Sequence, residues 1–298
     1  MDTYINPPEF LEARAKEMKA KRLEKKHFPE SPEHDVLLFL LENAPLKNWQ
    51  RDILSVIREE AYYYLPQAQT KIMNEGWATY WHSRIMTEKV LKDAEIIDYA
   101  EHHAGTVGGP KLRLNPYKLG LELFRDIEER WNKGQFGKEY DECDDLAVRD
   151  NWDKDLGLGR DKIYEVRHLY NDLTFIDTFL TEDFCRRSKM FVFAKDEKNP
   201  VWVIKTREFN QVKEMILNSL TNLGRPLMRV ADANFENRGE LLLTQDHDGR
   251  ELKWNFADDT LVNLHRLWKR PVHLETIKEG KKVRIAFNGE KHEVKSVN

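Results

Sequence analysis

The stretch from Lys71 to His82, which reads KIMNEGWATYWH, most constrains how this chain can fold. At about 100° per residue in a helix, Glu75 and His82 lie about 20° apart, two turns along one face. Their neighbours on that face are small or apolar, and Trp77 and Tyr80 are among the side chains opposite. A helix that is apolar on two sides is typical of burial between layers of protein. The stretch therefore predicts a buried helix with Glu75 as a buried carboxylate.

Gly76 predicts a close approach at the same place. A glycine inside a helix costs roughly 1 kcal/mol relative to alanine, because its backbone loses more conformational freedom on folding. A glycine in the middle of so apolar a helix indicates that another backbone or a bound group comes close to it.

A second carboxylate lies in the preceding helix, predicted over residues 47 to 65 and ended by Pro66. Glu60 lies at the centre of its apolar stripe, formed by Trp49, Ile53, Val56, Ile57, Tyr63 and Tyr64. If the chain reverses at Pro66, the two helices are antiparallel and Glu60 comes level with Glu75 in one polar pocket. A buried charged carboxylate without a partner costs several kcal/mol, so each should meet a cation, a metal, a tyrosine hydroxyl or a proton.

Two adjacent histidines, His102 and His103, follow the helix that begins at Lys71 and that we expect to continue to about Ala100. Adjacent histidines at a helix end can bind a metal. They can equally cap the helix as cations near its negative terminus. The sequence alone leaves both alternatives open.

The next helix begins at Asn115, an N-cap residue, with Pro116 at its first position. Its predicted core face consists of Gly120, Phe124, Ile127 and Trp131. Its predicted solvated side consists of Glu122, Asp126 and Glu129. Further helices are expected at residues 8–27, 35–42, 160–180, 207–222 and 258–269, with short helices and loops at 134–159. Strands are expected at residues 190–193, 201–204, 227–232, 239–245, 251–256, 272–276, 282–287 and 290–294.

This order of elements predicts an α+β protein with a mainly helical N-terminal part, followed by a smaller antiparallel α+β domain with β-hairpins. The predicted domains are a charged helix and linker at residues 1–34, a helical domain at 35–183 and the α+β domain at 184–298.

Charge and composition exclude several classes of function. Lys and Arg number 48 against 52 for Asp and Glu, a net charge of −4, which predicts no general affinity for nucleic acid or anionic membranes. No apolar run approaches the roughly 18 residues of a membrane span, and the first 25 residues lack a signal peptide's apolar core. These features predict a cytoplasmic protein. The two cysteines, Cys143 and Cys185, predict neither a disulfide framework nor a cysteine zinc site.

Four segments together resemble the stage V sporulation protein R (SpoVR) family: Met73–His82, Glu101–His103, Asn115–Gly120 and Trp268–Glu275. Members of that family usually carry a further N-terminal region with its own histidines, which this sequence lacks. The resemblance implies a role in spore cortex formation. It also implies protein partners, with a PrkA-type serine kinase and a von Willebrand A-like protein as the candidates, because these are often encoded nearby.

A more distant resemblance concerns chemistry. Asn74-Glu75-Gly76 is similar to the helix of gluzincin metallopeptidases whose glutamate is the third zinc ligand after an HExxH helix. No HExxH is present here. The other zinc ligands would have to come from His82, His102 and His103, or from the N-terminal region of the intact protein.

A carboxylate-bridged di-metal bundle is a further alternative, in which Glu60 and Glu75 would supply bridging ligands. That fold uses Glu-x-x-His pairs, and neither glutamate is followed by a histidine three residues later.

Two hypotheses about function follow. The first is a regulatory sporulation protein that binds protein partners. The second is a metal-dependent hydrolase acting on cell-wall peptide or amide bonds, with Glu75 and Glu60 as catalytic residues and Glu75, His82, His102 and His103 near the metal. For this chain alone we predict no bound catalytic metal and no peptidase activity.

Overall fold

The structure is a computed structural model that describes residues 9–14, 28–108, 114–195 and 201–297. It forms two compact units: unit 1 combines Met1–Tyr62 with Arg225–Asn298, and unit 2 is Tyr63–Gly224. The predicted α+β class is confirmed. The predicted domain boundaries stay a prediction, and most of the helix expected at residues 8–27 lies outside the described residues.

Unit 1 contains a five-stranded sheet with strand order β3-β4-β5-β6-β7. Its strands are β3 (Leu227–Phe235), β4 (Glu240–Asp246), β5 (Val272–Lys278), β6 (Lys281–Phe287) and β7 (His292–Ser296). Neighbouring strands are antiparallel except β4 and β5, which are parallel. The parallel pair arises because helix α14 (Trp254–Trp268) connects the two strands and returns the chain to the same end of the sheet.

The predicted strand at residues 251–256 is wrong. Helix α14 begins at Trp254, and Leu252 and Trp254 pack against the core of unit 1. The alternation of apolar residues that predicted a strand therefore marks a loop and the first turn of a helix that face the same core.

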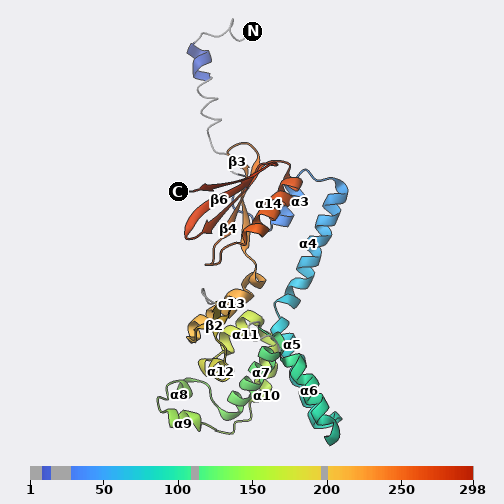
Figure 1. Ribbon diagram of the computed structural model, residues 1–298, viewed down its shortest axis with the longest axis vertical. Helices are drawn as coiled ribbons and strands as arrows, with labels where there is room; N and C mark the ends of the chain where they lie inside the picture. Colours follow the sequence, from blue (N-terminus) through green and yellow to red (C-terminus); the bar gives the residue numbers. More distant parts are fainter. Residues whose placement is uncertain (1–8, 15–27, 109–113, 196–200, 298) are drawn as a thin grey trace. The chain divides into compact units, whose positions relative to one another are not determined.

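Helices α14 and α3 (Val36–Asn43) cover one face of the sheet (Figure 1). Asp35 begins α3, since its carboxylate accepts a hydrogen bond from the backbone N–H of Leu38 at 2.9 Å. The side chains buried between these helices and the sheet include Phe39, Leu40, Val230, Leu241, Leu261, Trp268, Val272 and Ile285. The short buried helix predicted at residues 35–42 is confirmed.

Helix α4 (Asn48–Ala68) has no buried residue. It contacts unit 1 through Leu54 and through Arg58 and Tyr62, both of which donate hydrogen bonds to Asp35. The predicted end of this helix at Pro66 is wrong. Pro66 lies inside the last turn, where its missing N–H removes one intrahelical bond and the helix continues for two more residues.

Unit 2 is built on α5 (Lys71–Ile85) and α7 (Pro116–Lys133), with α6 (Ile96–Val107) between them in the chain. The predicted continuous helix from Lys71 to Ala100 is wrong. A π-helical turn, Met86–Val90, follows α5, the backbone is extended at Leu91, and a 3-10 turn, Asp93–Glu95, precedes α6. The wide turn closes through the Leu91 N–H to the Met86 carbonyl, which ends the helical ladder.

The predicted single helix at residues 160–180 is also wrong, because the chain forms α10 (Gly159–Leu169) and α11 (Asp172–Phe179). Asn171 lies between them and caps α11 by accepting the backbone N–H of Thr174. The remaining elements of unit 2 agree with the predicted order of short helices, hairpin and helix, except that helix α12 was not predicted. They are α8 (Lys138–Asp141), α9 (Leu146–Asp150), α12 (Glu182–Arg187), β1 (Val192–Lys195), β2 (Trp202–Thr206), α13 (Phe209–Leu220) and the 3-10 turn Thr221–Gly224.

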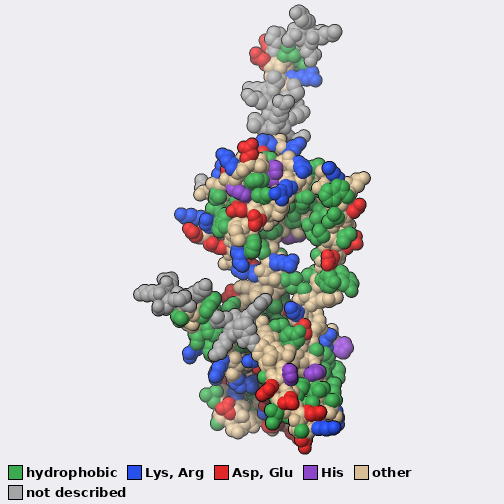
Figure 2. Space-filling view, turned by 45° about the vertical axis from the view of Figure 1, so that its right-hand side comes forward, with side chains coloured by type: hydrophobic (Ala, Val, Ile, Leu, Met, Phe, Trp, Pro, Cys, Tyr) green, Lys and Arg blue, Asp and Glu red, His purple; other side chains and the backbone are tan. Residues whose placement is uncertain are grey.

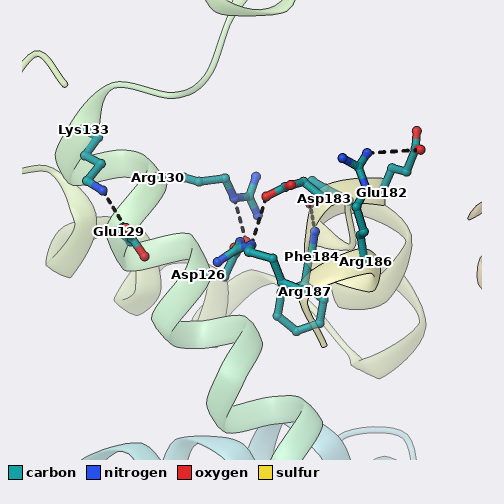
Figure 3. Close-up of polar contacts among 10 residues, drawn as sticks. Asp126, Glu129, Arg130, Lys133, Glu182, Asp183, Phe184, Arg186 and Arg187 are labelled. Atoms are coloured by element: carbon teal, nitrogen blue, oxygen red, sulfur yellow. Dashed lines mark hydrogen bonds and ion pairs between the residues drawn. The ribbon is translucent and has the colours of Figure 1, made fainter. Parts of the chain in front are cut away.

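Asp126, predicted on the solvated side of α7, is buried. Its carboxylate accepts hydrogen bonds from Arg130 Nε at 2.7 Å and from an Arg187 Nη at 2.5 Å (Figure 3). Arg187 comes from α12 and also pairs with Asp183. Two arginines compensate the buried charge, so Asp126 joins α7 to α12.

The described part of the chain contains no helix that combines the length and the apolar character needed to cross a membrane.

Candidate functional site

Helices α5 and α7 cross in direct backbone contact. A Cβ added to Gly76 would lie 2.4 Å from the backbone of Gly120, and a Cβ added to Gly120 would lie 2.3 Å from the Ile72 carbonyl oxygen. Neither position accepts a side chain without movement of a backbone. The close approach that the sequence predicted at Gly76 is confirmed, and the approaching group is α7.

The crossing determines how α5 and α7 pack against each other. Around it, Met73, Leu123 and Phe124 are fully buried. The crossing therefore fixes which α7 side chains lie beside each turn of α5.

A buried carboxylate fixes the N-terminus of α5. Asp172 is 3% exposed, and its two oxygens accept the backbone N–H groups of Ile72 at 2.8 Å and Met73 at 2.9 Å. Burial raises the pKa of Asp172, although these backbone hydrogen bonds act to lower it. Helix starts leave such N–H groups without intrahelical partners, so Asp172 caps α5 from a different helix.

Glu75 is half-buried and lines a cavity of about 800 Å³ at the start of α5. Tyr117 of α7 lines the same cavity, and its interaction with the Glu75 carboxylate raises the pKa of Tyr117. A tyrosine hydroxyl is one of the partners that the sequence predicted for this carboxylate. Lys71, Asn115 and Asp172 also line the cavity.

Glu60, predicted as the second buried carboxylate, is exposed. The apolar stripe around Glu60 on α4 is exposed as well. The Glu60 carboxylate is therefore not desolvated by burial and does not require a partner for its charge. Glu60 belongs to unit 1 and Glu75 to unit 2, and the pairing of the two carboxylates stays a prediction.

A second cavity, of about 490 Å³, lies further along the same helices and is bounded by α6. Glu128 of α7 accepts hydrogen bonds from the Tyr80 hydroxyl at 2.5 Å and from Arg84 Nη1 at 3.0 Å. Burial and the bond to Glu128 raise the pKa of Tyr80 to about 12, so its hydroxyl keeps its proton at neutral pH. Hydrogen bonding to Glu128 likewise raises the pKa of Arg84.

Two of the three predicted histidine ligands meet around one tyrosine. The Tyr99 hydroxyl lies 3.4 Å from His82 Nδ1 and 3.5 Å from His103 Nδ1. His103 is half-buried, whereas His82 and His102 are exposed. Burial, with the nearby charges of Arg125 and His82, lowers the pKa of His103. Figure 2 shows a group of histidine side chains at the surface of unit 2.

The residues of the two cavities do not complete a zinc site. Within the described ranges, no three His, Cys, Asp or Glu side chains gather where they could hold a metal ion. In the first cavity both oxygens of Asp172 accept backbone N–H groups, which leaves Glu75 as the carboxylate that faces the space. His82 and His103 share the Tyr99 hydroxyl as their neighbour, and a phenol replaces the carboxylate that a metal site would use there. The predicted zinc site would need ligands beyond these, and it stays a prediction.

Sequence reasoning missed four residues that shape these cavities: Tyr117, Asp172, Tyr99 and Arg125. Asp172 fell inside the single helix predicted over residues 160–180, so the break at residues 170 and 171 concealed its role as the cap of α5. The available signal was a spacing. Gly120 on α7 meets Gly76 on α5, and Tyr117 precedes Gly120 by three residues, about one helical turn. This spacing places Tyr117 beside Glu75, the neighbour of Gly76.

Fold and site together define an α+β protein whose helical unit holds two polar cavities along one pair of glycine-crossed helices. The family model for SpoVR-like proteins matches residues 2–225, and the model for the SpoVR-like C-terminal domain matches residues 226–279. The chain belongs to the SpoVR-like family, as the sequence motifs predicted. The border between the two models falls beside the end of unit 2 at Gly224.

A curated relative is the Escherichia coli (strain K12) protein named "Uncharacterized protein YcgB", which is 28% identical over 282 residues. The match covers 85% of this chain and 51% of the relative, so the chain spans about half the length of the curated relative it matches. No solved structure matches the chain.

Proposed function

We propose that this chain is a regulatory, protein-binding member of the SpoVR-like family that acts in spore cortex formation. The observation that carries the proposal is the apolar outer face of α4.

The outer face of α4 consists of apolar side chains that are about half exposed or more. Trp49 is 59% exposed, Ile53 53% and Val56 62%, and Ile57 lies beside them. The opposite side of the helix already contacts unit 1 through Leu54, Arg58 and Tyr62. A contiguous apolar patch of this kind is typical of a protein-binding surface, and helix faces with anchors at such spacings fit apolar grooves.

The partners proposed for this face are those that the family resemblance implies, a PrkA-type serine kinase and a von Willebrand A-like protein. Each is purified and its affinity for the chain is measured by biolayer interferometry. We expect Ile53→Asp to weaken binding at least about tenfold, because a charge would be buried in an apolar contact.

Ile97→Asp is the matched control, since Ile97 is an exposed isoleucine on α6 in the other unit, at 72% exposure. It should leave the affinity unchanged. If neither candidate partner binds, or if both variants bind as the unchanged chain does, the proposal fails.

A second function, a metal-dependent hydrolase acting on cell-wall peptide or amide bonds, is supported by Glu75 alone. Its half-buried carboxylate faces a cavity that is large enough for a peptide side chain, and Tyr117 lines the same cavity. The metal would need ligands that the described residues do not provide.

Metal analysis of a longer family member separates the two functions. A hydrolase requires a bound zinc, iron or manganese ion and loss of function in Glu75→Gln with the fold retained. A metal-free protein whose function survives Glu75→Gln would leave only the regulatory proposal.

A further inference from the structure

The second cavity of unit 2, between α5, α6 and α7, has a surplus of hydrogen-bond donors. Its two carboxylates are already occupied. Glu128 accepts from Tyr80 and Arg84 through its two different oxygens. Glu88 accepts from Arg84 Nε at 2.9 Å and is 53% exposed to solvent, which screens its charge.

Arg125 is the cation of this cavity that lacks a carboxylate. In the part of the chain that the structure describes, no ion pair forms to its guanidinium, and its hydrogen bond is to Ser83 Oγ at 3.3 Å. A guanidinium carries five N–H donors in a plane, so the single bond to Ser83 leaves most donors of the exposed Arg125 side chain available. Ser83 itself is buried and already donates its hydroxyl proton to the Tyr80 carbonyl at 3.0 Å.

The donors around Arg125 come from another helix. Tyr99 and His103 lie on α6, line the same cavity, and have their rings stacked with centroids 5.6 Å apart. Arg125 of α7 lines this cavity together with both side chains. A cation, a phenol and an imidazole from two helices therefore face one space.

Part of the wall of the cavity is apolar. It is formed by Ile96, Ala100 and Ala104, which lie on one side of α6 at helical spacing. A ligand in this space would meet donors at one end and aliphatic groups at the other.

We propose that this cavity binds a small organic oxyanion, a carboxylate or a phosphate monoester, with its charged oxygens on Arg125, Tyr99 and His103. The apolar part of the ligand packs against Ile96, Ala100 and Ala104. Oxyanions suit the site because guanidinium binds two oxygens of one carboxylate or phosphate in its own plane.

Isothermal titration calorimetry of the full chain tests the site with three ligands that share one ring. Phenyl phosphate and benzoate carry the two oxyanions, and benzylamine carries the opposite charge. We expect one or both anions to bind. The anion with the higher affinity identifies whether the site prefers a phosphate or a carboxylate. Benzylamine should bind at least about tenfold more weakly than that anion, because its ammonium would face the guanidinium.

Arg125→Gln should weaken binding of the anion at least about tenfold while circular dichroism shows an unchanged fold. Arg186→Gln is the matched control, because Arg186 is 71% exposed on α12 and does not line the cavity. A second variant, Ala104→Trp, should weaken the same anion by filling the apolar end without altering a charge.

Three results would overturn the site. These are no binding of either anion to the folded chain, equal affinity in Arg125→Gln and Arg186→Gln, or benzylamine binding as tightly as the anions.

Discussion

Helices α4 and α5 are both rich in aromatic residues and apolar on more than one side, yet they have opposite environments. On α5, Met73 and Tyr80 are buried in the core of unit 2. On α4 no residue is buried, and Trp49 and Ile53 are more than half exposed. The feature that separates them in the sequence is Gly76, which allows the backbone of α7 to touch α5. The spacing of apolar residues indicates which side of a helix prefers burial. A glycine among those residues indicates where the backbone of another element contacts the helix.

Gly76→Ala should have the largest effect, because it breaks the contact that distinguishes α5. Its Cβ would meet Gly120 backbone atoms at 2.4 Å, which only a shift of α7 can relieve. We expect a loss of about 3 kcal/mol or more in the free energy of unfolding, despite the better helix propensity of alanine. Urea unfolding of the purified variant measures it.

Gly105→Ala is the control, since Gly105 lies in α6 and an added Cβ meets nothing within 4 Å. It should be neutral or stabilise by up to about 1 kcal/mol. Equal stability of the two alanine variants would show that the helices do not touch at Gly76.

Asp172→Ala should have the next largest effect, because α5 depends on this cap from α11. Removing the carboxylate leaves the N–H groups of Ile72 and Met73 buried without acceptors, at a cost of about 2 to 3 kcal/mol. Asp161→Ala, at an exposed carboxylate in α10, should change stability by less than about 0.5 kcal/mol. Thermal unfolding compares them, and similar values would mean that Asp172 does not cap α5.

Asp35→Asn should have the smallest effect and tests the inner side of α4. Burial acts to raise the pKa of Asp35, but its bonds to Arg58, the Leu38 N–H and Tyr62 hold the pKa below the usual 3.8. A lowered pKa means that the carboxylate stabilises the folded state above about pH 4, and that this stabilisation disappears as the pH falls through the lowered value.

We therefore expect Asp35→Asn to cost about 1 kcal/mol at neutral pH, since Asn can still cap α3 but cannot pair with Arg58. The difference from the unchanged chain should shrink at acidic pH, as the pH falls through the lowered pKa of Asp35 and its carboxyl group becomes protonated. Urea unfolding at both pH values checks this, and a difference that is constant with pH would contradict the ion pair.

The order of elements was largely predictable, because caps and turns are local signals. Asn115 with Pro116 marked the start of α7, and the strands predicted at residues 272–276 and 282–287 agree with β5 and β6. Breaks inside apolar runs were not predictable. At the break before Asp172, the Asp172 N–H donates to the carbonyl of the distant residue Gln69, a contact that periodicity does not contain. The π-helical turn after α5 closes locally between Leu91 and Met86, in a segment without a glycine or proline to mark it.

The site was predictable only in part for the same reason. Gly76 predicted a close approach but did not indicate which helix would make it. Tyr117 could therefore not be assigned as the neighbour of Glu75. Glu60 was expected to be buried because it lies in an apolar stripe. The stripe is exposed, and its apolar character alone could not distinguish a core-facing side from a surface.

Hydroxyl-radical footprinting with mass spectrometry tests most directly whether α5 is core and the outer face of α4 is open. Met73 is 0% exposed and Met215, on α13, is 44% exposed, so the two methionines calibrate each other. We predict that Trp49 and Met215 oxidise rapidly while Met73 is protected. Oxidation of Met73 as fast as that of Met215, or protection of Trp49 in the isolated chain, would contradict the account.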